Sequence, residues 1–482
     1  MRKYGLCAVA AHSGGLRSLA NLVTSQTTNG VTPSAPSAQL RRQCLADSRV
    51  LLVQLYEAAV AAAHPDVCLA GQFPEVPTGG RLIVLGAGKA AAAMAVAAER
   101  HYRSAGVLDR VSGVLTAPYG YAATLGQAPR HLRIIEGRHP TPDAGSVAAA
   151  TAALELAATA KPGDLVLVLL SGGASALWAA PAAGLDLDGK TALTRGLLKS
   201  GADIHEMNAV RRHLSRIKGG RLALAAGGAR LLTLAISDVP GDDPATIGSG
   251  PTVADPTSLA DARAVIAKRR ERMTMLGLPV PAAVDRALAD PANETAKPGD
   301  PAFARSDYRI VATPARSLEA ACTLARAQGY EVMNLGDAVT GEAREVAAAH
   351  AKLAIEARQQ KRRLAIISGG ELEVTVRNRN GRGGRSQEYA LALALAINDI
   401  PGIAAVAADT DGIDGGEGLV TDPAGAIVTS ETVRKAAARH LAAQNFLDEN
   451  NATPFFEALG DLVIRGPTHT NVNDFRAILV DG

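Results

Sequence analysis

Aromatic side chains and net charge are both scarce in this chain of 482 residues. Only 3% of the residues are Phe, Trp or Tyr, and one is Trp, so a stacking platform for nucleic-acid bases has little material. The 50 Lys and Arg nearly cancel the 47 Asp and Glu, which argues against a broad surface for a polyanion. We therefore expect no nucleic-acid partner, and a small-molecule substrate that is held by charge and hydrogen bonds.

Cysteine is also scarce, and no apolar run continues for the length of a membrane span. The four cysteines lack the spacing of a disulfide framework or a zinc site: Cys7, Cys44, Cys68 and Cys322. Residues 165–185 are uncharged, but a Ser-Gly-Gly turn near their start and Pro181 near their end interrupt them. The sequence thus predicts no membrane span and fits a reducing compartment.

Acidic residues are missing from the start of the chain, because none precedes Asp47. Arg and Lys among Ser, Thr and Gly are typical of a transit peptide, but a disordered tail or a start codon assigned too early gives the same pattern. Residues 1–46 are therefore predicted to be a basic tail, disordered or targeting-like. We expect a cytoplasmic protein, or a mitochondrial one if the tail directs import.

Short apolar runs alternate with alanine-rich helical stretches along the rest of the chain. They occupy residues 82–85, 111–115, 165–170, 231–236, 309–311, 332–335, 364–367 and 403–407. Such alternation indicates a parallel sheet with helices on both faces. Proline and polar residues gather over residues 290–301. We predict an α/β protein of two domains, each a mainly parallel sheet flanked by helices, over residues 47–295 and 302–482 with a linker at 296–301.

Two glycine loops follow predicted strands of the first domain. Their candidate anion-binding residues are Gly86, Gly88 and Lys89 in the first loop, and Ser171, Gly172, Gly173 and Ser175 in the second. Glycine lets backbone N–H groups approach an anion, and a following helix adds its positive end. The first loop also fits the loose dinucleotide pattern, but the next strand ends in Thr-Ala-Pro without the acidic residue that binds a ribose. Lys89 favours a phosphoryl group, with a tight turn and a surface lysine as the alternative.

A basic segment over residues 208–220 predicts one amphipathic helix that ends at a glycine pair. Arg211 and Lys218 fall on one face of that helix by their spacing, so both can point at one anion. Asn208 precedes them on the same segment. A solvated basic face is the alternative, and the spacing does not separate the two.

Carboxylates gather after two predicted strands, with Asp238 and Asp242 in one loop and Asp409 and Asp411 in another. Bunched carboxylates repel one another unless a cation joins them, and magnesium with a nucleotide is the usual solution. Asx turns that cap the loops are the structural alternative.

The second domain adds a Ser-Gly-Gly-Glu turn and an arginine at a helix start. Gly369, Gly370 and Glu371 form the turn, and Arg385 opens an alanine-rich and leucine-rich helix. A cation at a helix start opposes the helix dipole, which favours a role facing an anion.

Together these loops resemble the glycerate kinases of the MOFRL type. The resemblance runs from about Arg49 to Arg476 and includes GAGKA at 86–90, GRHPTPD at 137–143, LLSGGASAL at 169–177, NAVRRHLSRIKGGRLA at 208–223, SDVPGDDPATIGSGPTVADP at 237–256, SGGE, GRGGRSQE and ADTDGIDG. It implies a Rossmann-like N-terminal domain and a MOFRL-type C-terminal domain around a cleft. It further implies ATP as donor, Mg²⁺ as cofactor, and D-glycerate as the acceptor that becomes 2-phosphoglycerate.

The resemblance also implies roles for individual residues. Lys89 and Arg385 match the cations that stabilise the transferring phosphoryl group in that family. Asp238 and Asp242 are then the first candidates for the metal, and Asp409 and Asp411 the second. Candidates for the substrate or its phosphates are Gly86, Gly88, Ser171, Gly172, Gly173, Ser175, Asn208, Arg211, Lys218, Gly369, Gly370 and Glu371.

The sequence leaves some alternatives open. Some relatives are labelled hydroxypyruvate reductases, so the alternative enzymatic hypothesis is an NAD(P)-dependent reductase. The non-enzymatic hypothesis is a regulator that binds a sugar acid without catalysis. Ala174 departs from the family, where a third glycine is common at this position. A homodimer is also left open.

Overall fold

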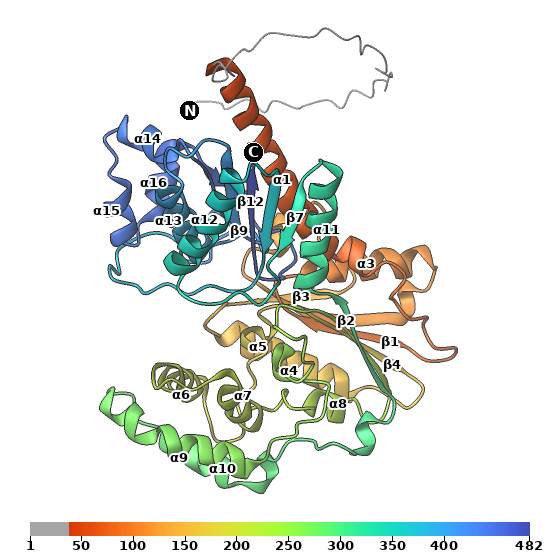
Figure 1. Ribbon diagram of the computed structural model, residues 1–482. Coiled ribbons are helices and arrows are strands. Elements are labelled where there is room, and N and C mark those ends of the chain that lie inside the picture. Colours follow the sequence, from red (N-terminus) through yellow and green to blue (C-terminus); the bar gives the residue numbers. More distant parts are fainter. Residues whose placement is uncertain (1–37) are drawn as a thin grey trace, which may run out of the picture. The chain divides into compact units, whose positions relative to one another are not determined.

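The computed structural model describes residues 38–482, with side chains described from Asp47 onward, and contains two six-stranded sheets (Figure 1). Residues 44–482 form one unit by their contacts. The first 37 residues of the predicted tail lie outside the described part of the chain, whereas helix α1 begins at Ala38 and ends at Ala63. Along the described chain, no helix combines the length and the apolar character that crossing a membrane requires.

The first sheet is parallel throughout and has the strand order β3-β2-β1-β4-β5-β6. Its strands are β1 (Leu82–Ala87), β2 (Val111–Pro118), β3 (Arg133–Gly137), β4 (Leu165–Leu170), β5 (Arg230–Ile236) and β6 (Ser306–Ala312). Every residue of β1 and β4 is buried, as expected for central strands that are covered on both faces. The strand order reverses between β1 and β4, and ligands of such sheets bind beyond the carboxyl ends of the strands at that point.

Helices cover both faces of this sheet. Helix α3 (Ala91–Ser104) packs on one face, while α4 (Ala144–Ala158), α5 (Ala174–Leu177) and α8 (Arg221–Ala225) pack on the other. A further apolar cluster joins four helices: α6 (Leu187–Lys199), α7 (Ile204–His213), α9 (Leu259–Met275) and α10 (Ala282–Ala289). Helix α2 (Pro65–Cys68) contacts α3.

The second sheet is mixed, with the order β11-β10-β9-β12-β8-β7. Its strands are β7 (Glu331–Asn334), β8 (Leu364–Ser368), β9 (Ile403–Asp409), β10 (Gly425–Thr429), β11 (Leu462–Val463) and β12 (Asp474–Val480). Only β7 and β8 of this sheet pair in parallel. β12 inserts between β8 and β9 and runs antiparallel to both, and β10 runs antiparallel to β9 and β11. The prediction of two α/β sheets is confirmed, but the prediction that both are mainly parallel does not describe the ladders of the second one.

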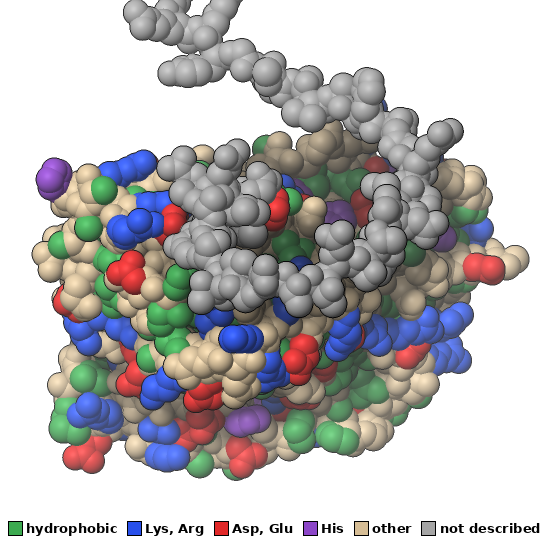
Figure 2. Space-filling model, turned by 45° about the horizontal axis from the view of Figure 1, so that its top comes forward, with side chains coloured by type: hydrophobic (Ala, Val, Ile, Leu, Met, Phe, Trp, Pro, Cys, Tyr) green, Lys and Arg blue, Asp and Glu red, His purple; other side chains and the backbone are tan. Residues whose placement is uncertain are grey.

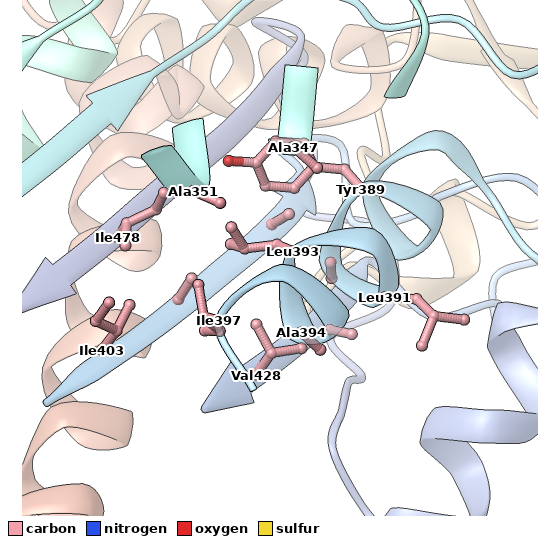
Figure 3. Packing of buried hydrophobic residues seen from close by; sticks show 14 of the residues in the cluster. Ala347, Ala351, Tyr389, Leu391, Leu393, Ala394, Ile397, Ile403, Val428 and Ile478 are labelled. Carbon is pink, nitrogen blue, oxygen red and sulfur yellow. The ribbon is translucent and has the colours of Figure 1, made fainter. Parts of the chain in front are cut away.

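Helix α13 (Arg385–Ala396) packs on one face of the second sheet. Tyr389, Leu393 and Ile397 lie against Ile403 and Ile478 of β9 and β12 (Figure 3). The remaining helices are α11 (Pro314–Ala327), α12 (Ala343–Gln359), α14 (Thr432–Ala437), α15 (Ala443–Asp448) and α16 (Ala452–Leu459). α1 and α11 contribute to the apolar cluster on the opposite face.

Two elements lie on a different sheet from the one their position in the sequence indicates. Strand β6 follows the predicted linker at 296–301, yet it pairs with β5 in the first sheet. Leu52, Leu55 and Tyr56 of α1 precede the first sheet, yet they pack with Phe475 of the second. The predicted domain boundaries at 295 and 302 stay a prediction. α1, which comes before them in the sequence, packs on the second sheet, and β6, which comes after them, belongs to the first.

Basic and acidic side chains are intermingled on the face of the molecule that Figure 2 shows. This mixture matches the net charge of +3. A large surface of one sign is therefore not seen on that face.

Candidate active site

The loops that follow β1 and β4 are bonded to each other at the point where the strand order reverses. The backbone N–H of Lys89 donates to the carbonyl of Gly172 at 2.8 Å, and the N–H of Ala90 donates to Ser171 Oγ at 3.0 Å. A Cβ on Gly88 would lie 2.1 Å from Ser171 Oγ, so only glycine fits there. The two predicted glycine loops therefore form one structure.

This bonding decides which backbone donors are free for an anion. The N–H of Gly88 is also used, because it donates to Thr116 O at 3.1 Å. Among the described residues, the N–H groups of Gly172 and Gly173 have no protein acceptor. Free donors at an anion site thus belong to the second loop, while the first loop contributes the side chain of Lys89.

Lys89 points to the second sheet, where its ammonium group forms an ion pair with Asp411. Asp411 lies in the loop after β9 and is buried. Burial alone would lower the pKa of Lys89, but Asp411 and Asp409 outweigh burial and raise it. Lys89 is therefore a cation at any physiological pH.

Arg385 is held by three carboxylates. Its Nε lies 2.8 Å from Asp474 Oδ1, and its two terminal nitrogens lie 2.8 Å from Asp409 Oδ2 and 2.9 Å from Glu371 Oε1. α13 begins at this residue because the carboxylate of Asp414 accepts the N–H groups of the next two residues, at 3.0 and 2.8 Å. The anionic cap offsets the unfavourable position of an arginine at a helix start.

Lys89 and Arg385 come from opposite sheets and reach adjoining carboxylates. The N–H of Asp411, the partner of Lys89, donates to Asp409 Oδ1 at 3.0 Å, and Asp409 is a partner of Arg385. The structure thus brings the two predicted catalytic cations together across one pair of aspartates.

Asp238, in the loop after β5, is held by two asparagines from the loop before β12. Asn471 Nδ2 donates to Asp238 Oδ2 at 3.2 Å, and Asn473 Nδ2 donates to the carbonyl of Asp238 at 2.7 Å. Burial raises the pKa of Asp238 to about 6. A Cβ on Gly172 would lie 2.4 Å from Asp238 Oδ2, so the carboxylate is adjacent to the free donors of the second loop.

The four predicted metal ligands do not converge on one point. In the described part of the chain, no three His, Cys, Asp or Glu side chains lie where they could hold a metal ion together. Asp409 and Asp411 are engaged by Arg385 and Lys89, as described above. One buried oxygen of Asp242, Oδ1, has no hydrogen-bond partner. Magnesium in kinases binds one or two carboxylates together with substrate phosphates. Asp238 and Asp242 are the two predicted ligands that form no ion pair with a described residue.

The predicted helix over residues 208–220 is wrong. Helix α7 ends at His213, and Ser215 forms an isolated β-bridge with Pro181. The reason is that Leu214 and Ile217 are buried in different apolar clusters, one among helices α6, α7, α9 and α10 and one against the first sheet. Arg211 and Lys218 therefore do not share a helix face.

Asn208 and Lys218 nevertheless meet at the second glycine loop. Lys218 Nζ donates to the carbonyls of Ser175 and Trp178, at 2.8 and 3.1 Å. The hydroxyl groups of Ser175 and Ser249 are 2.9 Å apart, and Ser249 donates to Asn208 Oδ1 at 3.2 Å. Tertiary contacts, and not helical spacing, bring these predicted binding residues to Ser175.

The predicted turn at Gly369 and Gly370 follows β8. Gly370 has a φ of +89°, and a Cβ there would lie 2.2 Å from the carbonyl oxygen of Val339. The carbonyl of Gly369 accepts a hydrogen bond from Arg476. These glycines allow close backbone packing, and Glu371 beside them reaches Arg385. A cavity of about 450 Å³ lies next to Arg385 and is lined partly by Leu372 and Val374.

Sequence reasoning missed several residues of this site. His139 lies against the second loop, because a Cβ on Gly173 would be 3.0 Å from His139 Nε2 and 3.6 Å from Lys89 Cγ. Burial and the nearby Lys89 lower the pKa of His139 to about 3, so the ring is neutral. Its GRHPTPD motif was a signal for it, whereas Asn471, Asn473 and Asp474 precede or begin a strand that the apolar pattern did not reveal.

Comparison with known proteins places the chain in a family. A domain of unknown function, DUF4147, matches residues 51–288, and the MOFRL family matches residues 364–474. A glycerate 2-kinase of Pyrococcus horikoshii is 34% identical over 90% of this chain and 98% of its own. A protein of Agrobacterium vitis named as a putative hydroxypyruvate reductase is 44% identical over 90% of this chain and 94% of its own.

A solved structure agrees with this assignment. The crystal structure of a glycerate kinase from Thermotoga maritima has a TM-score of 0.76 and 32% identity, over 92% of this chain and 100% of the other. Sequence and fold thus match over almost the same span as the resemblance derived from the loops. The chain belongs to the MOFRL-type glycerate kinase family.

Proposed function

We propose that this protein is an ATP-dependent kinase that phosphorylates the 2-hydroxyl of D-glycerate. The observation that supports it most directly is the meeting of Lys89 and Arg385, from opposite sheets, at the adjoining carboxylates of Asp411 and Asp409. Phosphoryl transfer depends on positioning and charge neutralisation more than on covalent chemistry of the protein. Two cations beside two free backbone donors supply both.

Each group has a role in this proposal. The N–H groups of Gly172 and Gly173 bind phosphate oxygens, and Lys89 with Arg385 offsets the negative charge that spreads over the transferring group. The acidic partners Asp409 and Asp411 keep the two cations oriented when no phosphate is present. Asp238 and Asp242 would hold Mg²⁺, which neutralises the phosphates of the nucleotide when bound.

Relatives named as glycerate kinases support this assignment, and the reductase name is the competing one. A nicotinamide dinucleotide needs a carboxylate at the end of β2 for its ribose, but β2 ends in Thr-Ala-Pro. Thr116 at that end accepts a hydrogen bond from the buried indole of Trp178, at 3.1 Å. The site therefore favours phosphate chemistry over hydride transfer.

The proposal is tested by product analysis with the full-length chain. Incubation with ATP, MgCl₂ and D-glycerate should give 2-phosphoglycerate, which phosphorus NMR distinguishes from the 3-phosphate. Oxidation of NADH by hydroxypyruvate without ATP turnover on glycerate would overturn the kinase in favour of the reductase. Binding of glycerate without either reaction would leave the non-catalytic regulator.

A further inference from the structure

Three basic side chains, Lys190, Arg211 and Lys218, have no counter-charge among the described residues, and Lys218 contacts Ser175. Lys218 is 1% exposed and Lys190, on α6, is 8% exposed, while Arg211 on α7 is partly buried. None of the three forms an ion pair with a described carboxylate, and Arg211 makes no hydrogen bond to a described residue. A buried cation without a partner is costly, and burial lowers the pKa of all three groups. An anion bound beside them would offset that cost.

Arg212, the next residue in the sequence, differs from Arg211 because it has a carboxylate partner within the protein. Arg212 is buried beside Arg211, and its Nη1 lies 2.9 Å from Asp255 Oδ1. A second nitrogen of Arg212 donates to the carbonyl of Ala245 at 2.7 Å. The fold thus provides a carboxylate for the structural arginine and none for Arg211.

The two lysines are bound to backbone carbonyls. Lys190 Nζ donates to the carbonyl of Leu214 at 3.0 Å, and the N–H of Ala182 donates to the same carbonyl at 3.2 Å. Lys218 Nζ donates to the carbonyls of Ser175 and Trp178. Arg211 lowers the pKa of both lysines, which is the electrostatic sign of their proximity. Burial is the larger cause and brings the pKa of Lys190 to about 7.

Asn208 adds an uncharged hydrogen-bond donor near the three basic side chains. Asn208 and Arg211 are three residues apart on α7 and so face the same side of the helix. The amide oxygen of Asn208 accepts from Ser249, while its Nδ2 makes no hydrogen bond to a described residue. An anion beside Ser175 would find this amide donor next to the cations.

We infer that Lys190, Arg211 and Lys218 form the pocket that binds the carboxylate of the acceptor acid and so selects an acid over an uncharged alcohol. The inference rests on the proposed kinase function and deepens it. Ser175 is two residues from Gly173, whose N–H is free, and Lys89 lies beside Gly173. An acid anchored by its carboxylate at Ser175 would present the hydroxyl on the adjacent carbon to the phosphoryl site, which accounts for transfer to position 2.

A direct binding measurement tests the pocket without catalysis. Trp178 is the one tryptophan of the chain, and its carbonyl accepts from Lys218, so its fluorescence reports on the pocket. D-Glycerate is titrated into the full-length protein without ATP. Lys190→Gln and Arg211→Gln should each weaken binding about 10-fold to 100-fold, as expected when a charged hydrogen bond is lost. Lys199→Gln, an exposed lysine on the same helix, should bind like the wild type.

Steady-state kinetics then separates the acceptor from the nucleotide. The variants should raise KM for glycerate by the same factor and leave KM for ATP within about twofold. Two variants on different helices guard against loss of folding, which circular dichroism checks.

The results that would refute the carboxylate pocket differ from the result that would refute the kinase function. If KM for ATP rises and glycerate binding is unchanged, the pocket holds nucleotide phosphates and the inference is wrong. Unchanged binding and kinetics in both variants would also overturn it, while the wild-type kinase activity stands. A wild-type chain that binds glycerate through these cations and has no kinase activity would instead refute the proposed function alone.

Discussion

Asp411 and Asp409 are bonded to each other, with the N–H of Asp411 donating to the carboxylate of Asp409 at 3.0 Å. Because Lys89 pairs with the first and Arg385 with the second, this one contact joins a cation of each sheet into a single charged group. Asp411 and Lys89 are both buried or nearly so, and their charges are costly to separate.

Removal of Lys89 should make stability depend more strongly on pH. Burial and Asp409 raise the pKa of Asp411 to about 7 even with Lys89 present. Lys89→Ala raises that pKa further, so the folded protein keeps a proton that the unfolded chain releases. The free energy of unfolding of the variant should then go on falling above pH 7, by up to about 1.4 kcal/mol per pH unit.

The measurement is urea unfolding at pH 6 and pH 8. The gap between wild type and Lys89→Ala should be wider at pH 8. Lys268→Ala, which removes an exposed pair with Glu206, should keep the same small difference at both values. A gap that does not change between pH 6 and pH 8 contradicts a buried, unpaired Asp411.

Gly172→Ala should impair activity more than folding. Its Cβ would lie 2.2 Å from Asn471 Nδ2 and 2.4 Å from Asp238 Oδ2, so the hydrogen bond between those side chains must open. Both atoms are at the ends of side chains that can move, and we expect a stability loss of only about 1–2 kcal/mol. Activity should fall at least about 10-fold, since one lost hydrogen bond to a charged group costs that much.

Gly126→Ala is the matched control for that variant. Nothing lies within 4 Å of a Cβ at position 126, and the glycine has no positive φ. Kinetic constants and thermal midpoints of the two variants are compared with the wild type. Equal activity in both variants would show that the contact between Gly172 and Asp238 is not part of the site.

Lys190→Met should stabilise the protein without ligand. Burial lowers the pKa of Lys190 to about 7, so between pH 7 and about 10 the unfolded chain binds a proton that the folded protein does not. Stability from this group therefore rises with pH across that window, and the cost of the buried lysine is greatest at pH 7 and below.

The prediction is a larger unfolding free energy for Lys190→Met than for wild type at pH 7, with a gap that shrinks toward pH 10. The hydrogen bond to Leu214 O that the variant loses offsets only about 1 kcal/mol of the gain. Denaturant titrations at three pH values give the comparison. A variant less stable than wild type at pH 7 would mean that the lysine supports the fold and not a ligand.

Local signals in the sequence predict much of the fold. All eight predicted runs overlap strands. Most are short runs of β-branched residues, leucines or alanines, which favour strands. Strands β3, β10, β11 and β12 were not predicted. The place of β12 between β8 and β9 depends on pairing with strands far away in the sequence. The loop before it, with Asn471 and Asn473, has one glycine and one arginine, Gly466 and Arg465, but neither a Ser-Gly-Gly turn nor a group of carboxylates.

The candidate site was predictable where glycine or charge marks a strand end. Lys89, Ser171 and Asp238 follow three strands of one parallel sheet, so topology alone brings them to one edge. The single helix predicted through Arg211 and Lys218 is wrong because its apolar residues, Leu214 and Ile217, are buried in two different apolar clusters. Lys190 gave no signal in the sequence, since only burial distinguishes it from Lys199 on the same helix.

In the proposed kinase, Lys89 and Arg385 act on the transferring phosphoryl group. The most direct measurement is kcat for ATP-dependent phosphorylation of D-glycerate by Lys89→Ala and Arg385→Ala, with Arg382→Ala as the control, an exposed arginine three residues before Arg385 that pairs with Glu457. We expect kcat to fall about 10²–10³-fold in each of the two variants, with KM values little changed and the control unaffected. A near-normal kcat with only a raised KM in both variants would show that neither side chain acts on the phosphoryl group.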